Sequence, residues 1–229
     1  TGMEISIKDA SLQHFKDIGL NVSKKDVTYE NTQARERTQI LMDLANLHQA
    51  LVVGTGDLSE LALGWCTYNG DHMSMYAVNT SIPKTLVRYL VQYFVEKEEN
   101  ESIKKTLKDI LDTPISPELL PPDTLGNITQ KTESVVGPYL LHDFTMYHFL
   151  RYGASPKKIE FLENHAFQGI YSKEEIHKWL DFFFRRFFSQ QFKRNCMPDG
   201  VKVGTISVSP RGDLRMPSDA DASIWRDEL

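Results

Sequence analysis

Residues 50–60 read ALVVGTGDLSE and decide the fold that we predict for this chain. The first four residues form a short, uninterrupted apolar run, which is typical of a buried parallel strand. A glycine-rich turn follows at once, and we expect a helix from there to Leu63. A strand, a turn and a helix in this order indicate an α/β fold with a parallel sheet.

The turn at residues 54–57 is a candidate ligand site. Ligands of open α/β sheets bind at the carboxyl ends of strands, where glycines expose backbone N–H groups at the start of a helix. A phosphate group or a nucleotide would fit there. In the alternative interpretation, Asp57 only caps the helix and Glu60 closes a capping box with it. The residues alone leave both interpretations open.

The composition is that of an ordinary globular protein, with 41% hydrophobic residues among 229. A net charge of -5 argues against nucleic-acid binding through a broad basic surface. Cys66 and Cys196 are too few for a disulfide framework and lack metal-site spacing, which favours a reducing, cytoplasmic location. No apolar run approaches the roughly 18 residues of a membrane-spanning helix, so we expect no membrane partner.

The rest of the chain predicts mainly helices. A short helical pattern ends near Gly19. Residues 31–48 predict a helix whose apolar face carries Ile40, Leu44 and Leu47. Its opposite face carries Asn31, Arg35 and Thr38, which are either ligand contacts or solvated surface. Further helices are expected at residues 83–96, 101–111, 140–152, 156–165 and 172–191, and an irregular, mobile loop at 113–137.

Two further segments carry candidate binding residues. The loop at 64–74 places Trp65 and Tyr68 beside Asp71, a composition suited to framing a flat ring, although Trp65 also suits a core. Lys84 opens a helix, where a cation opposes the helix dipole, so its position hints at a bound anion.

The phenylalanine-rich helix at 182–192 suits a core or an oligomer interface. The pair Lys193 and Arg194 at its end suits a helix C-terminus, but these long cations can also reach a phosphate or a carboxylate.

Motifs in a fixed order along nearly the whole chain resemble glutamine-dependent NAD synthetases. They are ENTQAR at 30–35, VGTGDLSELALGW at 53–65, GDHMS at 70–74, VN at 78–79, PKT at 83–85, DTPISPEL at 112–119, VGPY at 136–139, HDF at 142–144, LRYG at 150–153, QFKR at 191–194 and SPRGD at 209–213. The resemblance implies a Rossmann-like adenine nucleotide alpha hydrolase (ATP-pyrophosphatase) fold, N-terminally truncated and helix-rich. It also implies that ATP, with Mg²⁺, adenylates the nicotinate carboxylate of deamido-NAD and that ammonia displaces AMP.

The resemblance assigns roles to individual residues. It implies that Thr55, Lys84 and Thr113 contact ATP and that Glu60 contacts both Mg²⁺ and deamido-NAD. Asp71 falls near the ammonia site and is a candidate to take a proton from ammonium. The positions matching those that hold deamido-NAD are Asn31, Arg35, Glu60, Trp65, Tyr68 and Lys193.

The resemblance also indicates parts that these residues do not contain. The family's Ser-Gly-Gly-x-Asp-Ser pyrophosphate loop and its glutaminase domain are expected upstream. We therefore expect residues 1–229 to be a partial synthetase domain that forms homo-oligomers. Within it we expect a nucleotide-binding α/β part (1–100), a mobile loop and helical part (101–192) and a tail (193–229).

Two alternatives stay open. One is a catalytically silent fragment with a structural or oligomerisation role, through the helix at 182–192. The other is a different amidating ATP-pyrophosphatase, against which the GDHMS and FKR segments argue.

Overall fold

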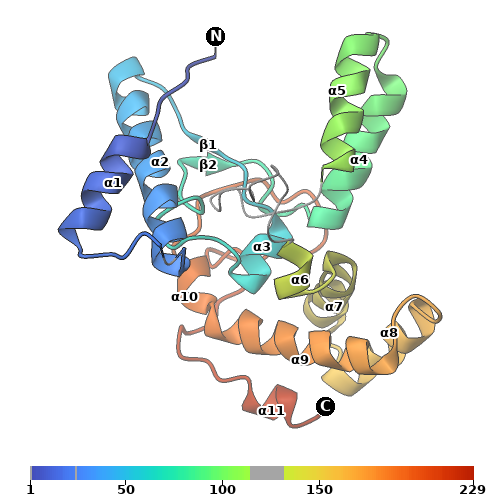
Figure 1. Ribbon diagram of the computed structural model, residues 1–229. Helices are drawn as coiled ribbons and strands as arrows, with labels where there is room; N and C mark the ends of the chain where they lie inside the picture. Colours follow the sequence, from blue (N-terminus) through green and yellow to red (C-terminus); the bar gives the residue numbers. More distant parts are fainter. Residues whose placement is uncertain (1, 24, 114–131) are drawn as a thin grey trace.

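A computed structural model describes residues 2–23, 25–113 and 132–229 of the chain (Figure 1). In chain order the elements are α1 (Lys8–Asp17), α2 (Val27–His48), β1 (Val53–Gly54), α3 (Leu58–Leu63), β2 (Tyr76–Ala77), α4 (Lys84–Lys97), α5 (Glu101–Asp112), α6 (Thr132–Val136), α7 (Tyr139–Tyr152), α8 (Pro156–Ala166), α9 (Lys173–Ser189), α10 (Gln191–Arg194) and α11 (Ser223–Arg226).

The sheet is small and parallel. Strand β1 pairs with β2 in the register Val53 with Tyr76 and Gly54 with Ala77. The parallel strand predicted at 50–53 is thus confirmed in kind, but its predicted burial is wrong, because Leu51 is 58% and Val53 is 53% exposed. Among the described residues β2 is the only strand beside β1, so the other edge and these side chains stay open.

The hydrophobic core joins α3 to α7 and α9. Its buried members include Leu58 and Leu63 on α3, Met146 on α7, and Phe183, Phe184 and Phe187 on α9. The prediction that the phenylalanine-rich helix forms core is confirmed for Phe183, Phe184, Phe187 and Phe188, which are buried. Phe192 differs, since it is 39% exposed and lies against Tyr68. Of these rings, only those of Phe182, which is half-buried, and Phe192 keep surface that an oligomer interface on this helix could use.

Helix α2 starts earlier than predicted and packs through other residues. Asp26 caps it, because its carboxylate accepts hydrogen bonds from the N–H groups of Thr28 and Tyr29. The predicted apolar stripe is wrong at Leu47, which is 74% exposed, whereas Ala34 and Ala45 are buried. Helix α1 packs beside the start of α2, where the rings of Phe15 and Tyr29 stack with centroids 5.1 Å apart.

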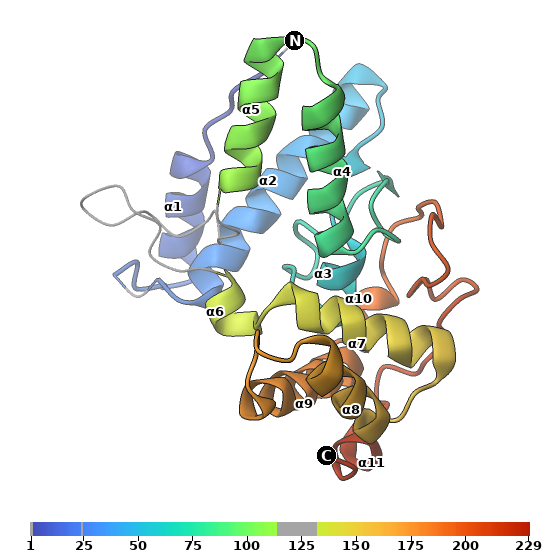
Figure 2. The ribbon, with the colours of Figure 1, turned by 90° about the vertical axis from the view of Figure 1, so that its right-hand side faces the viewer.

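Helices α4 and α5 form a hairpin that projects from the body of the molecule (Figures 1 and 2). Their bounds agree with the predicted ones to within one residue, and α4 begins directly after Pro83. Most of the loop predicted at 113–137 lies outside the described residues, but residues 132–136 form α6 and are not irregular.

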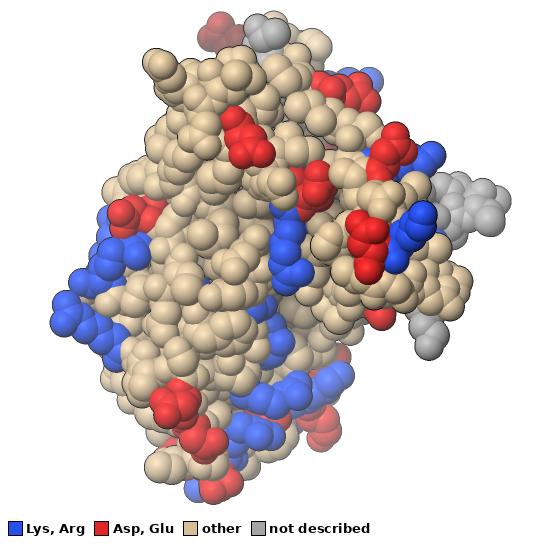
Figure 3. All heavy atoms as spheres, turned by 90° about the vertical axis from the view of Figure 1, so that its left-hand side faces the viewer, with Lys and Arg blue, Asp and Glu red and all other residues tan. Residues whose placement is uncertain are grey.

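Two features of the described parts of the chain concern the length of the helices and the distribution of charge on the surface. No helix there has the length and apolar character to cross a bilayer. Figure 3 views the molecule from the left-hand side of Figure 1, where α1 and α2 lie, and shows acidic and basic side chains interspersed with wide uncharged areas.

Candidate functional site

The N-terminal end of α3 follows the carboxyl end of β1 and begins with a capping box. The carboxylate of Asp57 accepts a hydrogen bond from the Glu60 N–H at 2.9 Å, and Glu60 Oε2 accepts one from the Asp57 N–H at 3.2 Å. The capping box predicted for Asp57 and Glu60 is therefore present. It uses only one oxygen of Glu60, so it does not exclude a second role for this side chain.

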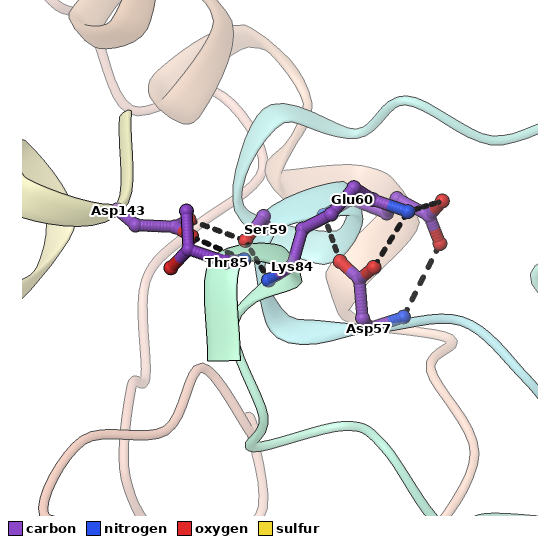
Figure 4. A network of polar contacts seen from close by, with 6 residues as sticks. All are labelled: Asp57, Ser59, Glu60, Lys84, Thr85 and Asp143. Carbon is purple, nitrogen blue, oxygen red and sulfur yellow. Dashed lines mark hydrogen bonds and ion pairs between the residues drawn. The ribbon is translucent and has the colours of Figure 1, made fainter. Parts of the chain in front are cut away.

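Lys84 reaches this capping box from the start of α4 (Figure 4). Its Nζ lies 2.7 Å from Asp57 Oδ2 and 2.7 Å from Glu60 Oε1. The ammonium also lies 5.4 Å from the centre of the Tyr139 ring. We call Asp57, Glu60 and Lys84 the charged cluster. Because it stands where β1 ends and α3 begins, the cluster occupies the place where α/β sheets bind ligands.

Burial makes the acids of the charged cluster weaker. It raises the pKa of Glu60 to about 7 and raises that of Asp57, against the opposing effect of Lys84. Burial alone would lower the pKa of Lys84, but the two carboxylates outweigh it and the pKa is raised. Two carboxylates thus share one ammonium, so bringing further positive charge here is favourable.

A second layer of polar contacts lies beside Lys84 and includes three residues that the sequence analysis missed as site residues, Asp143, Ser59 and Thr85. Asp143, on α7, accepts a short hydrogen bond from the Ser59 hydroxyl and bonds from the N–H and hydroxyl of Thr85 at 3.0 and 2.7 Å. Ser59 in turn accepts a bond from the Lys84 N–H at 2.8 Å. Their only signal in the sequence was membership of the motifs HDF at 142–144, VGTGDLSELALGW at 53–65 and PKT at 83–85.

The loop at residues 64–72 runs along the N-terminal half of α2. Arg35 Nε donates to the carbonyl of Tyr68 at 3.1 Å, and the Thr67 hydroxyl donates to Asn31 Oδ1 at 2.8 Å. Asp71 Oδ1 accepts a bond from the Thr67 N–H at 2.7 Å and is exposed. Asn31 and Arg35 therefore meet the loop, as expected of one common surface.

The ring of Tyr68 is held on the other side of this loop. It stacks on His72, with centroids 5.4 Å apart, and lies 5.3 Å from the ring of Phe192. Its hydroxyl is 3.6 Å from the thiol of Cys196.

Burial raises the pKa of the other cysteine, Cys66, to about 12, so this thiol stays protonated and unreactive.

Three cations hold the C-terminal end of α3, which closes at Gly64 in the left-handed region with φ of 60°. Lys193 Nζ donates to the carbonyls of Gly64 and Cys66 at 2.8 and 2.7 Å. Arg186 donates to the carbonyls of Leu63 and Gly64, and its guanidinium lies 5.7 Å from the ring of Trp65. Arg194, which is 0% exposed, donates to the carbonyls of Leu61, Ala62 and Phe187.

The predicted site residues thus fall into two groups at opposite ends of α3. Glu60 and Lys84 meet at its N-terminal end. Around the loop that follows its C-terminal end lie Asn31, Arg35, Trp65, Tyr68, Asp71 and Lys193. Thr55 is exposed beyond β1, and the hydroxyl of exposed Thr113 donates to the Asp109 carbonyl of its own helix. The structure joins neither of these two to either group.

The predicted Mg²⁺ would need ligands among the side chains of the charged cluster. Within the described ranges, no three His, Cys, Asp or Glu side chains come together in a way that could hold a metal ion. Mg²⁺ in nucleotide sites, however, is held by one or two carboxylates together with phosphate oxygens and water. The pair Asp57 and Glu60, with Lys84 already seated between them as a cation, fits that donor set.

Comparison with known proteins gives the family. The NAD synthase family model matches residues 2–114. A glutamine-dependent NAD(+) synthetase from Mycobacterium leprae is 45% identical over an alignment that covers 100% of this chain and 37% of that protein. One from Mycobacterium tuberculosis is 44% identical with the same coverage. The chain thus spans 37% of the length of these curated relatives.

The fold agrees with this relationship. The crystal structure of a glutamine-dependent NAD(+) synthetase from Cytophaga hutchinsonii matches 95% of this chain and 33% of that chain with a TM-score of 0.70, at 23% identity. This likeness shows the fold, which is the predicted helix-rich α/β fold of the adenine nucleotide alpha hydrolase class with a small parallel sheet. Since sequence relatives align with the whole chain and the fold is shared, the chain belongs to the glutamine-dependent NAD synthetase family.

Proposed function

We propose that this chain is part of a ligase that amidates deamido-NAD to NAD in an ATP-dependent reaction that releases AMP and pyrophosphate. The observation that carries the proposal is the position of the Lys84 ammonium. It lies between the carboxylates of Asp57 and Glu60, where β1 ends and α3 begins. An adenylation reaction produces pyrophosphate, whose charge must be offset by cations.

The charged cluster is assigned to ATP. Lys84 binds phosphate oxygens of ATP, which requires its ammonium to leave at least one of its two carboxylates. Glu60 is then free to hold Mg²⁺, which supplies positive charge beside the phosphates. Thr55 and Thr113 are assigned to ATP by the resemblance alone.

The surface around the loop at 64–72 is assigned to deamido-NAD. Its members Asn31, Arg35, Tyr68 and Lys193 are held by contacts to one another or to the loop backbone, so they form a preorganised surface. Trp65 frames the nicotinate ring from the same loop, and Glu60 borders it from α3. Asp71, which is exposed, takes a proton from ammonium and so releases the nucleophilic ammonia.

The proposal extends to the protein that contains this chain. Glutamine serves as the nitrogen donor through a glutaminase domain elsewhere in that protein, which forms homo-oligomers in the cytoplasm. The parts 1–100, 101–192 and 193–229 remain our proposed division of the chain. A purely structural role receives less support, because most of the rings on which it depended, namely Phe183, Phe184, Phe187 and Phe188, are buried in the core.

The test uses the purified protein in its full natural length. It is incubated with ATP, Mg²⁺, deamido-NAD and ammonium, and the formation of AMP and NAD is followed by chromatography. We expect both products in equal amounts, and neither when deamido-NAD is omitted. Formation of AMP without NAD, or a requirement for GTP or another acceptor, would contradict the proposal.

A further inference from the structure

Helix α4 begins without a cap of its own. Its N-cap residue is Pro83, which provides no side-chain hydrogen bond to the first turn. The first N–H groups of a helix lack partners within the helix and need acceptors from elsewhere. Here the acceptors come from other helices: the Lys84 N–H bonds to Ser59 on α3, and the Thr85 N–H bonds to Asp143 on α7.

Asp143 connects the start of α3 to the start of α4 (Figure 4). It is 8% exposed, and its carboxylate accepts three hydrogen bonds, from the Ser59 hydroxyl and from the N–H and hydroxyl of Thr85. One oxygen serves α3 and the other serves α4, so a single side chain from α7 fixes the distance between the two helices.

The position of Lys84 depends on that distance. Lys84 is the first residue of α4, whereas Asp57 and Glu60, which bind its ammonium, belong to the start of α3. The Ser59 hydroxyl donates to Asp143 and accepts from the Lys84 backbone, so it links the carboxylate directly to the residue that carries the ammonium.

We propose that Asp143 is a positioning residue, which holds the start of α4 against α3 and thereby keeps the Lys84 ammonium in the charged cluster. It touches no substrate in this role. Its kinetic consequence rests on the function proposed above, because it acts on ATP only through Lys84. Its structural consequence is independent of that function.

The variant Asp143→Asn separates this role from simple burial. Asparagine keeps the volume, but one of its two terminal atoms becomes a donor and cannot accept from Ser59 or Thr85. The matched control is Glu163→Gln. Glu163 is also a buried carboxyl that accepts from a threonine hydroxyl of α7, at 2.7 Å from Thr145, but its described contacts do not lead to Lys84.

The first measurement needs no activity. The ligand-free protein is treated with an amine-acylating reagent, and the modification rate of Lys84 is followed by mass spectrometry. We expect Lys84 to react about tenfold faster in Asp143→Asn, because the loss of one charge-assisted hydrogen bond is of that size. Glu163→Gln should leave this rate unchanged. If Asp143→Asn does not fold, Thr85→Val, which removes one of the three donors, should give a smaller increase.

The second measurement uses the full-length protein and the assay above. Asp143→Asn should raise KM for ATP about tenfold, with a smaller change in KM for deamido-NAD, and should add nothing in a Lys84→Met background. Acylation rates at Lys84 equal to those of the unsubstituted protein would overturn the inference. If the unsubstituted protein formed no NAD, the proposed function would fail, and the acylation rates would still decide the role of Asp143.

Discussion

The two ends of α3 are both crowded with charge, but the charges do different things. At the N-terminal end, the carboxylates of Asp57 and Glu60 both bind the side-chain ammonium of Lys84. At the C-terminal end, Arg186, Lys193 and Arg194 bind backbone carbonyls. Acids at the start and cations at the end both suit the dipole of the helix.

The two ends of α3 differ in whether their charged side chains can exchange one binding partner for another. A backbone carbonyl cannot move away without distorting the chain, so the cations of the C-terminal end are committed to structure. A side-chain ion pair can open when a better partner arrives. With raised pKa values at Asp57 and Glu60 and a partly exposed Lys84, the N-terminal end is the one suited to exchanging its contacts for a ligand. This contrast leads to four predictions.

The largest effect is expected at the structural end, for Arg194→Met. Methionine fills much of the volume but leaves the carbonyls of Leu61, Ala62 and Phe187 without this donor. We expect a loss of about 3 kcal/mol in the free energy of unfolding, measured with denaturant. The control is Arg226→Met, which breaks an exposed pair with Asp181 and should cost about 1 kcal/mol or less. Equal losses would remove the contrast between a committed and an exposed cation.

At the exchangeable end, Glu60→Gln should reduce NAD formation by about a hundredfold and change stability little. The amide oxygen of glutamine can keep the capping bond to the Asp57 N–H, whereas the charge that pairs with Lys84 is lost. The matched control is Glu175→Gln, at the same position of the capping box that begins α9. A lower melting temperature with normal turnover would mean that Glu60 is only a cap.

Arg35→Ala and Asn31→Ala should each raise KM for deamido-NAD about tenfold, with a smaller effect on KM for ATP. Lys193→Ala tests whether this residue serves the structure, the substrate or both, because it binds two backbone carbonyls and is also assigned to deamido-NAD. We expect both a lower melting temperature and a raised KM for deamido-NAD. A change in stability alone would place Lys193 wholly with the structural end. Arg151→Ala, at the exposed end of α7, serves as the control.

The smallest effect concerns pH. Because burial raises the pKa of Glu60 from 4.5 to about 7, the folded protein holds this proton more tightly than the unfolded chain. The resulting stability is fully present below pH 4.5 and is lost as the pH rises through 7. The melting temperature of the unsubstituted protein should therefore fall by more over this range than that of Glu60→Gln. Parallel curves for the two proteins would show that Glu60 titrates normally.

Local signals in the sequence were read correctly where only a few neighbouring residues decide the outcome. The capping box of Asp57 and Glu60, the start of α4 after Pro83 and the parallel strand at Val53 depend on spacings of a few residues. The order of motifs also indicated the family, since each motif can be read without knowing which others it contacts. The burial of Leu47 and Val53 was predicted wrongly, because burial depends on what the rest of the chain places beside them.

Only the tertiary structure decided which charges meet. Ser59 and Asp143 are 84 positions apart, and Lys193 lies 129 positions from the Gly64 carbonyl that it binds. No periodicity links residues at such distances. The packing of α7 and α9 against α3 brings these residues together. Hydrophobic burial drives this packing, and because it is non-directional it does not itself select which polar groups come into contact. The amino-acid sequence by itself therefore determined the helices, the turn and the family, whereas the partners of Lys84, Asp143 and Arg194 were decided by the packing of the helices.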